Sequence, residues 1–227
     1  TLHSRNLSGT QADIDANSRD YYLAAIEAMD TEFGRFWGSL DAQEQANTIV
    51  VYLGDNGTPR SAVDPNASQN GNKGNLFEGG INTPLFVSGP GITRQGEREA
   101  ALVSHTDLFA TLAELAGANL PEYNDGKSFA DLLSDRNADV RDYAFTEFSG
   151  GWAIRNAQYK LIEEDDGRQD LFDLVADPGE QTDLIGSGGN TNAILSELED
   201  EAARIRSVEN IAGAKFSNVA ASCTEYV

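Results

Sequence analysis

Residues 48–60 read TIVVYLGDNGTPR, and residues 71–91 read GNKGNLFEGGINTPLFVSGPG. Each stretch holds a short apolar run, Ile49 to Leu53 and Leu85 to Val87, that meets glycine directly or one residue later. Such runs, rich in β-branched or aromatic residues, are typical of buried strands. Because the first run shows no alternation of apolar and polar residues, we expect a strand covered on both faces, as in the parallel centre of an α/β sheet.

The sequence Gly54-Asp55-Asn56-Gly57 follows the first predicted strand directly. Open α/β sheets place their ligands at the carboxyl ends of strands. Asn-Gly is also the strongest short hairpin signal, but residues 58–65 hold two prolines and no alternation, which disfavours a second strand there. A carboxylate beside a carboxamide offers oxygen donors that suit a hard cation such as calcium. Asp55 and Asn56 are therefore candidate metal ligands.

Apolar residues recur at steps of three and four from Ser18 to Leu40, which predicts an amphipathic helix with Asn17 or Ser18 as its cap. Residues 1–17 are polar and are predicted to be irregular. We expect the aromatic and methionine stripe of the helix to be core that packs on the sheet. That stripe consists of Tyr22, Ile26, Met29, Phe33, Phe36, Trp37 and Leu40.

A second helix is predicted from Leu108 to Ala116, with Ser104 or Thr106 as its candidate cap and Gly117 as its stop. Beyond it, residues 119–126 shift in composition to Asn, Pro, Tyr and Asp, which indicates a boundary. We therefore expect two domains, an α/β domain over residues 1–122 and a C-terminal subdomain over residues 123–227.

The C-terminal subdomain is predicted to be an antiparallel sheet with one covering helix. Short steps between successive apolar runs favour antiparallel pairing of the predicted strands, which span 143–148, 151–155, 159–163 and 170–174. Asn190 or Thr191 is expected to cap a helix whose apolar face covers the sheet. That face is formed by Ile194, Leu195, Leu198, Ala202 and Ile205.

Composition limits the partners of the chain. Its 227 residues include 16 lysines and arginines against 37 aspartates and glutamates, a net charge of −21. Nucleic acid and anionic membrane surfaces are excluded as partners because their phosphates would be repelled. No apolar run approaches the roughly 18 residues of a membrane helix, and the first residues do not form a secretory signal. The single cysteine, Cys223, allows no internal disulfide.

Four segments, in this order along the chain, resemble the C-terminal part of the sulfatases of the alkaline phosphatase superfamily. The ordered set is more specific than any one segment, and it spans nearly the whole chain. The four are the strand ending in Asp55-Asn56-Gly57, the run KGNLFEGGI at 73–81 leading to Thr83-Pro84, the run DLFATLAELAG at 107–117, and LFDL at 171–174 with DPGE at 177–180.

The resemblance implies a sulfatase fold, with a mixed, mostly parallel sheet and helices, and hydrolysis of sulfate esters of small molecules or sugars. It implies that Asp55 and Asn56 hold part of a calcium site, and that the Lys73 ammonium contacts a sulfate oxygen and offsets charge developing there. By composition alone a solvated surface lysine is the favoured interpretation of position 73, and it is the position of Lys73 in the matching segment that favours the sulfate-binding role. Glu78 is interpreted as structural, fixing the turn at Gly79-Gly80. A periplasmic or secreted location is implied as well.

Two histidines are weaker candidates. His3 could be the sulfatase histidine that helps bind the sulfate, although a solvated terminal histidine is the simpler interpretation. His105 lies in a segment that in sulfatases is a structural turn into a helix.

The sequence departs from the family at the nucleophile, a formylglycine made from the first residue of Cys-x-Pro-x-Arg or Ser-x-Pro-x-Arg. Cys223 is followed by TEYV, and Ser88, the one serine two places before a proline, has Ile92 in place of arginine. The first acidic metal-binding pair of the family has no matching segment either. We therefore expect this chain alone to be inactive.

Three functional interpretations follow from this departure. The chain is the C-terminal part of a sulfatase whose N-terminal part supplies the nucleophile, or a non-catalytic fragment or accessory protein on a sulfatase scaffold. A phosphodiesterase or phosphonate hydrolase of the same superfamily is also consistent, because the residues retained suit either anion. The uncovered sheet and helix surface predicts either self-association or a partner formed by the missing N-terminal part.

Overall fold

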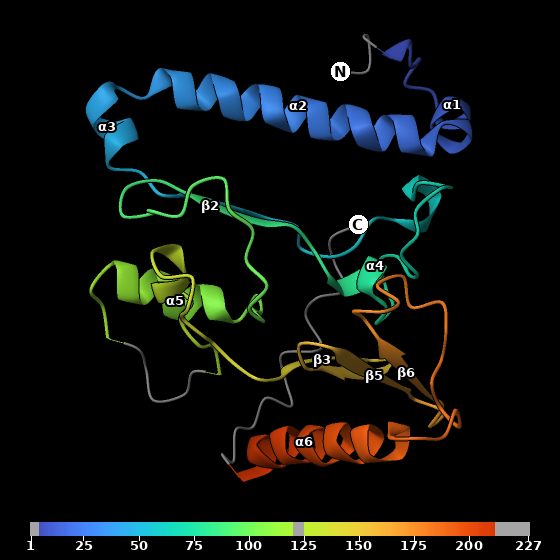
Figure 1. The fold of residues 1–227 in the computed structure, drawn as a ribbon. Helices are drawn as coiled ribbons and strands as arrows, with labels where there is room; N and C mark the ends of the chain where they lie inside the picture. The colour runs from blue at the N-terminus through green and yellow to red at the C-terminus, as the bar shows by residue number, and fades with distance from the viewer. Residues whose placement is uncertain (1–4, 120–124, 212–227) are drawn as a thin grey trace.

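A computed structural model of the chain describes residues 5–119 and 125–211. Figure 1 shows α2, the helix Ser18–Ser39, along one side of the molecule and α6, the helix Thr191–Ile211, along the opposite side. Two sheets lie between them. One is the pair β1 (Val50–Leu53) and β2 (Leu85–Ser88), and the other has the order β3-β4-β5-β6. His3, Cys223 and the tail from 212 lie outside the described residues.

The N-terminal helices are more extensive than the sequence predicted. The helix expected at 18–40 is confirmed as α2, and Asn17 occupies its N-cap position without a side-chain cap bond. Within the stretch predicted to be irregular, α1 (Gln11–Ala16) forms because the Thr10 side chain accepts a hydrogen bond from the Asp13 N–H. A short α3 (Ala42–Ala46) follows α2 and begins with a capping box between Asp41 and Glu44.

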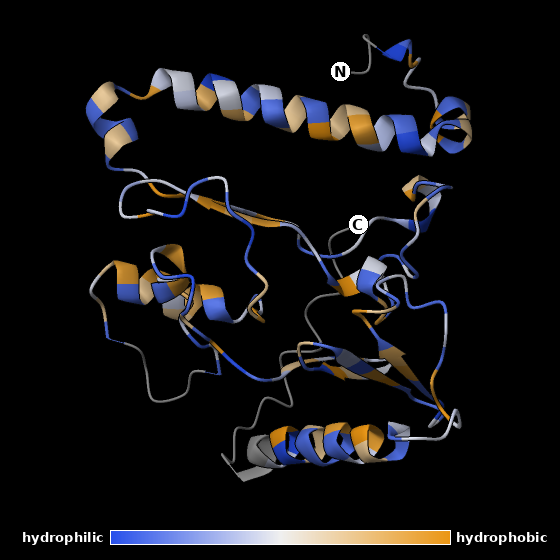
Figure 2. Cartoon of the chain, in the orientation of Figure 1, coloured by the Kyte–Doolittle hydropathy of each residue, from blue (hydrophilic) through white to orange (hydrophobic). Residues whose placement is uncertain are grey.

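The apolar stripe of α2 does not form core in this chain, so the expectation that it packs on the sheet is wrong, whereas the expectation that this chain leaves apolar surface of the helix uncovered is confirmed. Ala24 is its buried residue, whereas Ile26, Met29, Phe33 and Phe36 are all more than a third exposed. Figure 2 shows hydrophobic and hydrophilic positions interspersed along this helix. An open pocket of about 400 Å³ lies between α2, α3 and the strands; Phe33, Trp37, Val50 and Pro90 are among its lining residues. The two strands are too small a sheet to cover the helix.

The prediction of a mostly parallel sheet is also wrong for this chain. β1 pairs antiparallel with β2, with Val50 opposite Ser88 and Leu53 opposite Leu85, and no parallel pair occurs within residues 5–119 and 125–211. The strands are not buried either, because the paired rings of Tyr52 and Phe86 are 40% and 64% exposed. A continuous apolar run indicates that both faces suit an apolar cover, but it does not give the direction of the neighbouring strand.

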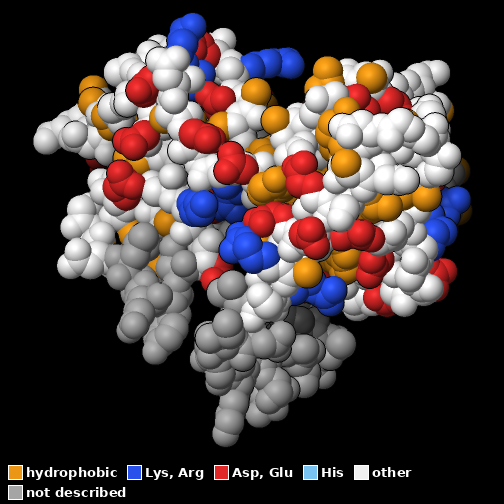
Figure 3. All heavy atoms as spheres, turned by 60° about the horizontal axis from the view of Figure 1, so that its bottom comes forward, with side chains coloured by type: hydrophobic (Ala, Val, Ile, Leu, Met, Phe, Trp, Pro, Cys, Tyr) orange, Lys and Arg blue, Asp and Glu red, His pale blue; other side chains and the backbone are white. Residues whose placement is uncertain are grey.

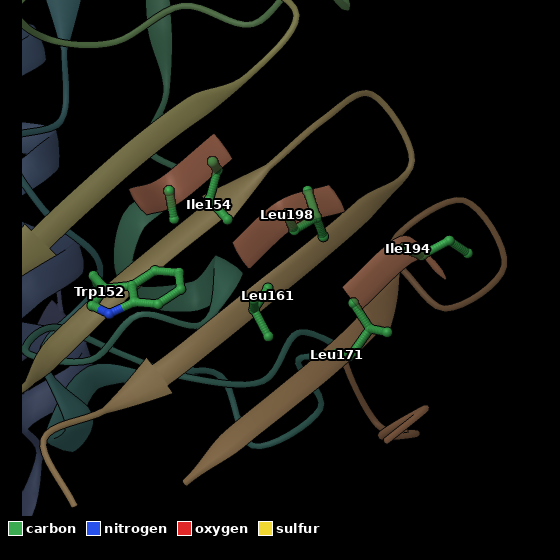
Figure 4. Packing of buried hydrophobic residues seen from close by; sticks show 7 residues of the cluster. Trp152, Ile154, Leu161, Leu171, Ile194 and Leu198 are labelled. Carbon is green, nitrogen blue, oxygen red and sulfur yellow. The ribbon is translucent and has the colours of Figure 1, made fainter. Parts of the chain in front are cut away.

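The antiparallel C-terminal sheet is confirmed. Its strands are β3 (Ala144–Phe148), β4 (Gly151–Arg155), β5 (Tyr159–Glu164) and β6 (Gln169–Asp173), each paired antiparallel with the next. One face packs on α6, as predicted. Figure 4 shows this packing, in which Trp152, Ile154, Leu161 and Leu171 of the strands meet Ile194 and Leu198 of the helix.

The other face of this sheet packs on a four-residue helix, α4 (Glu78–Ile81). Because side chains alternate along a strand, Ala153, Ile162 and Phe172 point away from α6 and form a second cluster with Leu76. Figure 1 shows α4 between the two sheets. The sheet is therefore covered on both faces, and its α4 face is tied to the segment that carries Lys73.

The helix predicted at 108–116 is confirmed as α5 (Asp107–Leu115). Thr106 occupies the N-cap position but makes no side-chain cap bond; instead the Asp107 carboxylate accepts the Ser104 N–H at 2.6 Å. Gly117 ends the helix with a φ of +66°, a conformation that favours glycine. The buried Asp107 carboxylate also accepts the Lys127 N–H at 2.8 Å and pairs with Arg141. Residues 107–141 are thereby joined, and the division at residue 122 stays a prediction.

On the face that Figure 3 presents, the surface charge is mixed. Figure 3 shows acidic, basic and apolar side chains interspersed over the face of the molecule that it presents. In the described part of the chain, no helix is both long and apolar enough to cross a membrane.

Candidate functional site

Asp55 and Asn56 lie directly after β1, at its carboxyl end, as the sequence predicted. Asp55 is exposed, and one of its carboxylate oxygens accepts the Asn56 N–H at 3.0 Å. The Asn56 side-chain nitrogen donates to the Gly57 carbonyl at 3.0 Å. Because that bond uses the nitrogen end of the carboxamide, its oxygen is the atom that could bind a cation. The alternative of a tight hairpin at Asn56-Gly57 is excluded, since the strand that pairs with β1 is β2, which begins only at Leu85.

The loop that carries these two residues is held tightly by backbone contacts. The Gly54 N–H donates to the Pro84 carbonyl at 2.9 Å, and the Gly57 N–H donates to the Gly80 carbonyl at 2.8 Å. A side chain at Gly57 would meet the Gly79 carbonyl oxygen at 2.0 Å, so this position requires glycine. The loop after β1 is therefore docked on the Gly79-Gly80 turn at the start of α4.

Lys73 is brought to the same loop by its backbone. Its N–H donates to the Thr58 carbonyl at 2.9 Å, one residue beyond Gly57. The lysine side chain is exposed. The backbone thus joins the segments of Asp55, Asn56 and Lys73, whereas the direction of the Lys73 ammonium toward a shared cavity stays a prediction.

The donor chemistry of Asp55 and Asn56 fits calcium in kind. A carboxylate and a carboxamide oxygen are hard donors, but calcium takes six to eight oxygens, which two side chains cannot supply. No group of three or more His, Cys, Asp or Glu side chains able to hold a metal occurs among the described residues. These two residues would hold the ion as part of a larger ligand set.

Five residues after Lys73, a buried ionic cluster fixes the start of α4; sequence reasoning assigned Glu78 a structural role but missed its partners. The Glu78 carboxylate accepts hydrogen bonds from the Lys160 ammonium at 2.9 Å, the Asn82 side-chain amide at 2.8 Å and the Arg155 guanidinium at 3.2 Å. The Lys160 ammonium also pairs with Glu180 at 2.7 Å. The side chains of Lys160 and Glu180 are fully buried. Lys160 and Arg155 together balance the two carboxylates.

A sequence signal for this cluster exists. Lys160 stands inside the predicted strand 159–163 at a position whose side chain faces the covered side of the sheet, and a buried lysine needs an acidic partner. The partner could not be chosen from the sequence, because Glu78 and Glu180 are 82 and 20 positions away among 37 acidic residues.

Glu180 connects the cluster to the backbone. Its second carboxylate oxygen accepts the Glu78 N–H at 2.5 Å, and its carbonyl accepts the Asn70 side-chain amide at 3.3 Å. Its backbone has a φ of +54°, unusual for a residue other than glycine. Burial raises the pKa of the Glu180 carboxyl, and the charge of Lys160 opposes that rise.

The structure gives His105 no place in an ionic or ligand cluster of the described residues. Its ring Nε2 lies 3.2 Å from the Thr83 hydroxyl, and the side chain is exposed. This contact agrees with a structural turn ahead of α5.

Two family models match the sequence of the chain. The family model described as "Sulfatase" matches residues 3–118, and the one described as "N-sulphoglucosamine sulphohydrolase, C-terminal" matches residues 71–208. An "Ulvan-active sulfatase" of Formosa agariphila is 30% identical over 82% of this chain and 41% of its own length. "Arylsulfatase K" of Mus musculus is 27% identical over 99% of this chain and 41% of its own length.

A solved structure shows the same relation in three dimensions. The structure of Ps i-CgsB in complex with k-i-k-neocarrahexaose is 27% identical, with a TM-score of 0.69, over 83% of this chain and 43% of that chain. The chain therefore spans less than half the length of the relatives it matches. With the sulfatase family model matching residues 3–118, more than half of its length, this chain belongs to the sulfatase family of the alkaline phosphatase superfamily.

Proposed function

We propose that this chain is the C-terminal part of a sulfuric ester hydrolase. In it, Asp55 and Asn56 supply half of a calcium site, and Lys73 binds the sulfate group. The observation that carries the proposal is the joining of the three residues' segments at the carboxyl end of β1, where Thr58 accepts the Lys73 N–H and Gly57 donates to Gly80. Calcium bound there would neutralise negative charge on the nucleophile and the sulfate oxygens.

The roles of this chain's own residues follow from their chemistry. The carboxylate of Asp55 and the amide oxygen of Asn56 would orient the cation, and the docked glycine loop would keep both from moving during the reaction. Lys73 would place its ammonium beside a sulfate oxygen, where a fixed positive charge stabilises charge that grows on the ester as the bond breaks. The nucleophile would come from the N-terminal part of the enzyme.

The substrate class that we propose is a sulfated sugar or an aryl sulfate. One matching family model is that of the N-sulphoglucosamine sulphohydrolase C-terminus, one relative is an ulvan-active sulfatase, and another is an arylsulfatase. These names share the sulfate group and differ in the molecule that carries it, so they support the proposed sulfate group more strongly than either proposed carrier.

The test uses the longer enzyme encoded by the gene, assayed with calcium against an aryl sulfate and a sulfated sugar. Asp55→Ala and Lys73→Ala are each expected to lower kcat by about 10²-fold or more. Asp165→Ala and Lys127→Ala remove an exposed aspartate and an exposed lysine elsewhere and serve as matched controls. Unchanged activity in both site variants would show that the site is assigned to the wrong residues.

Two further measurements separate the alternative functions. The 227-residue chain alone, assayed against the same sulfates, is expected to show no turnover, because the nucleophile segment is not in its sequence. Turnover of a phosphodiester or phosphonate ester exceeding that of sulfate esters in the longer enzyme would assign it to the related hydrolases instead.

A further inference from the structure

We infer that Glu180 is a positioning residue for the proposed sulfate site. Together with Lys160 and Glu78, it fastens the segment that carries Lys73 to the C-terminal sheet, without touching substrate. The inference rests on the proposed role of Lys73. The C-terminal sheet would thus help to build the proposed sulfate site, although no residue of the sheet is proposed to contact the substrate.

The first observation is a set of contacts between the turn 177–181 and the segment 68–72. The Asn70 N–H donates to the Gly179 carbonyl at 3.0 Å, and the Gln181 side chain donates to the Ser68 carbonyl at 3.3 Å. A side chain at Gly179 would meet the Ser68 carbonyl oxygen at 2.4 Å. The turn therefore lies directly against the residues that lead into Lys73.

The second observation is that one residue, Glu180, contacts both ends of the Lys73 segment, one through its carboxylate and the other through its backbone carbonyl. Glu180 accepts the Glu78 N–H after Lys73, and its backbone carbonyl accepts the Asn70 amide before it. The Gly79 N–H closes the same segment by donating to the Asn70 carbonyl at 2.8 Å. Residues 70–79 thus form a loop whose two ends are held by one residue.

The third observation is the electrostatic anchor of Glu180 itself. Its carboxylate is fully buried, and a buried carboxylate stays ionised only where a cation is held beside it. Lys160 supplies this charge from β5 and shares it with Glu78. The Lys160 ammonium is in turn fixed by the sheet, because Ile162 and Phe172 pack beside α4 on the same face.

Two backbone hydrogen bonds connect the segment held by Glu180 to the loop of the proposed metal ligands. Gly57, which follows Asp55 and Asn56, donates to Gly80, and Lys73 donates to Thr58. Loss of the Glu180 contacts would therefore loosen both the loop of the metal ligands and that of the lysine. A residue that only stabilised the sheet would leave these two distant hydrogen bonds unchanged.

The test is amide hydrogen exchange, read residue by residue, on the 227-residue chain. In Glu180→Ala, exchange of the Glu78 amide is expected to be about tenfold faster or more, because its acceptor is lost. The Gly79 amide, which donates to the Asn70 carbonyl, is expected to exchange faster as well, because the anchoring charge of its segment is lost. The deciding amides are those of Gly57 and Lys73, which are expected to exchange faster as well. Glu180→Gln keeps an acceptor oxygen and is expected to show a smaller change at Glu78.

Two control variants separate positioning from general destabilisation. Glu201→Gln removes a carboxylate that pairs with Arg204 at 2.7 Å on the outside of α6, the same distance as in the Lys160–Glu180 pair. It is expected to change no amide of residues 57–80. Leu198→Ala opens a cavity under α6 and is expected to speed exchange in the sheet without selecting residues 57–80.

The outcomes are distinct. Faster exchange at Glu78 and Gly79 with no change at Gly57 and Lys73 would overturn the inference, as would equal effects of Glu180→Ala and Leu198→Ala on all amides. If exchange responds as expected while Lys73→Ala leaves the longer enzyme fully active, the positioning by Glu180 stands and the proposed role of Lys73 falls.

Discussion

Replacing Lys160 by methionine would remove the cation at the centre of the buried cluster while keeping an unbranched side chain of similar length. Glu180 would be left as a fully buried carboxylate without its cation, beside Glu78, whose other cationic contact is Arg155 at 3.2 Å. Removing one member of a buried ion pair costs about 3–5 kcal/mol, because the remaining charge stays buried. We expect Lys160→Met to lower the free energy of unfolding at pH 7 by an amount in this range.

The loss should depend on pH in a defined direction. Burial already raises the pKa of the Glu180 carboxyl, and removal of Lys160 takes away the charge that opposes this rise. A carboxyl whose pKa is higher in the folded protein favours folding below its unfolded pKa, and this contribution is lost as pH rises through the folded pKa. The destabilisation by Lys160→Met should therefore be smaller at pH 4.5 than at pH 7.

The assay is urea denaturation followed by the fluorescence of Trp152, which lies in the core between the sheet and α6. A Trp37→Phe background removes the other tryptophan. The double variant Lys160→Met with Glu180→Gln leaves no uncompensated charge at position 180 and should recover most of the lost stability. A loss below about 1 kcal/mol at pH 7 in the single variant, or a double variant no more stable than the single one, would refute the reasoning.

Three further predictions concern other parts of the molecule. The 227-residue chain is expected to self-associate through its uncovered apolar surface. Phe86→Ser should therefore reduce its sedimentation coefficient more than the control Val175→Ser, which alters another apolar side chain that is 71% exposed. A monodisperse monomer at micromolar concentration would contradict this. Hydrogen bonds from the Tyr21 hydroxyl first, and then from Ser8 and Asn17, lower the pKa of the Asp13 carboxyl to about 2. Tyr21→Phe should therefore raise that pKa in a carboxyl NMR titration, and an unchanged midpoint would count against the bond. Leu198→Ala should destabilise the C-terminal sheet by about 2–5 kcal/mol in urea denaturation, and a cost below this range would mean that α6 collapses onto the sheet.

The elements that could be predicted from the sequence are those whose signals are local. The period of apolar residues and the capping residues gave α2, α5 and α6 close to their observed bounds. The short steps between apolar runs gave the antiparallel order of β3 to β6, because a short connection allows no crossover. The position of Asp55 after β1 followed from the same kind of reasoning.

The errors arose where the outcome depends on what lies beside an element. The aromatic stripe of α2 and the apolar run of β1 both indicate surfaces suited to burial, but Phe33 and Tyr52 are each more than a third exposed. An apolar pattern indicates that a surface is suited to burial, but it does not indicate whether another part of this chain covers that surface. The matching relatives are more than twice as long as the matched part, which agrees with surfaces that this chain does not cover itself.

The contacts of the ionic cluster also bear on the predicted division of the chain at residue 122. Glu78 is joined to Lys160, Asn70 to Gly179, and Leu76 packs with Ile162, so each pair spans that point in the sequence. A chain cut at residue 122 would leave Lys160 without Glu78 and would expose the face of the sheet that packs on α4. The site segment and the C-terminal sheet are therefore held together by a shared core, and the division at residue 122 stays a prediction. For that reason, loss of the contacts between Glu78, Lys160 and Glu180 should be measurable at Lys73.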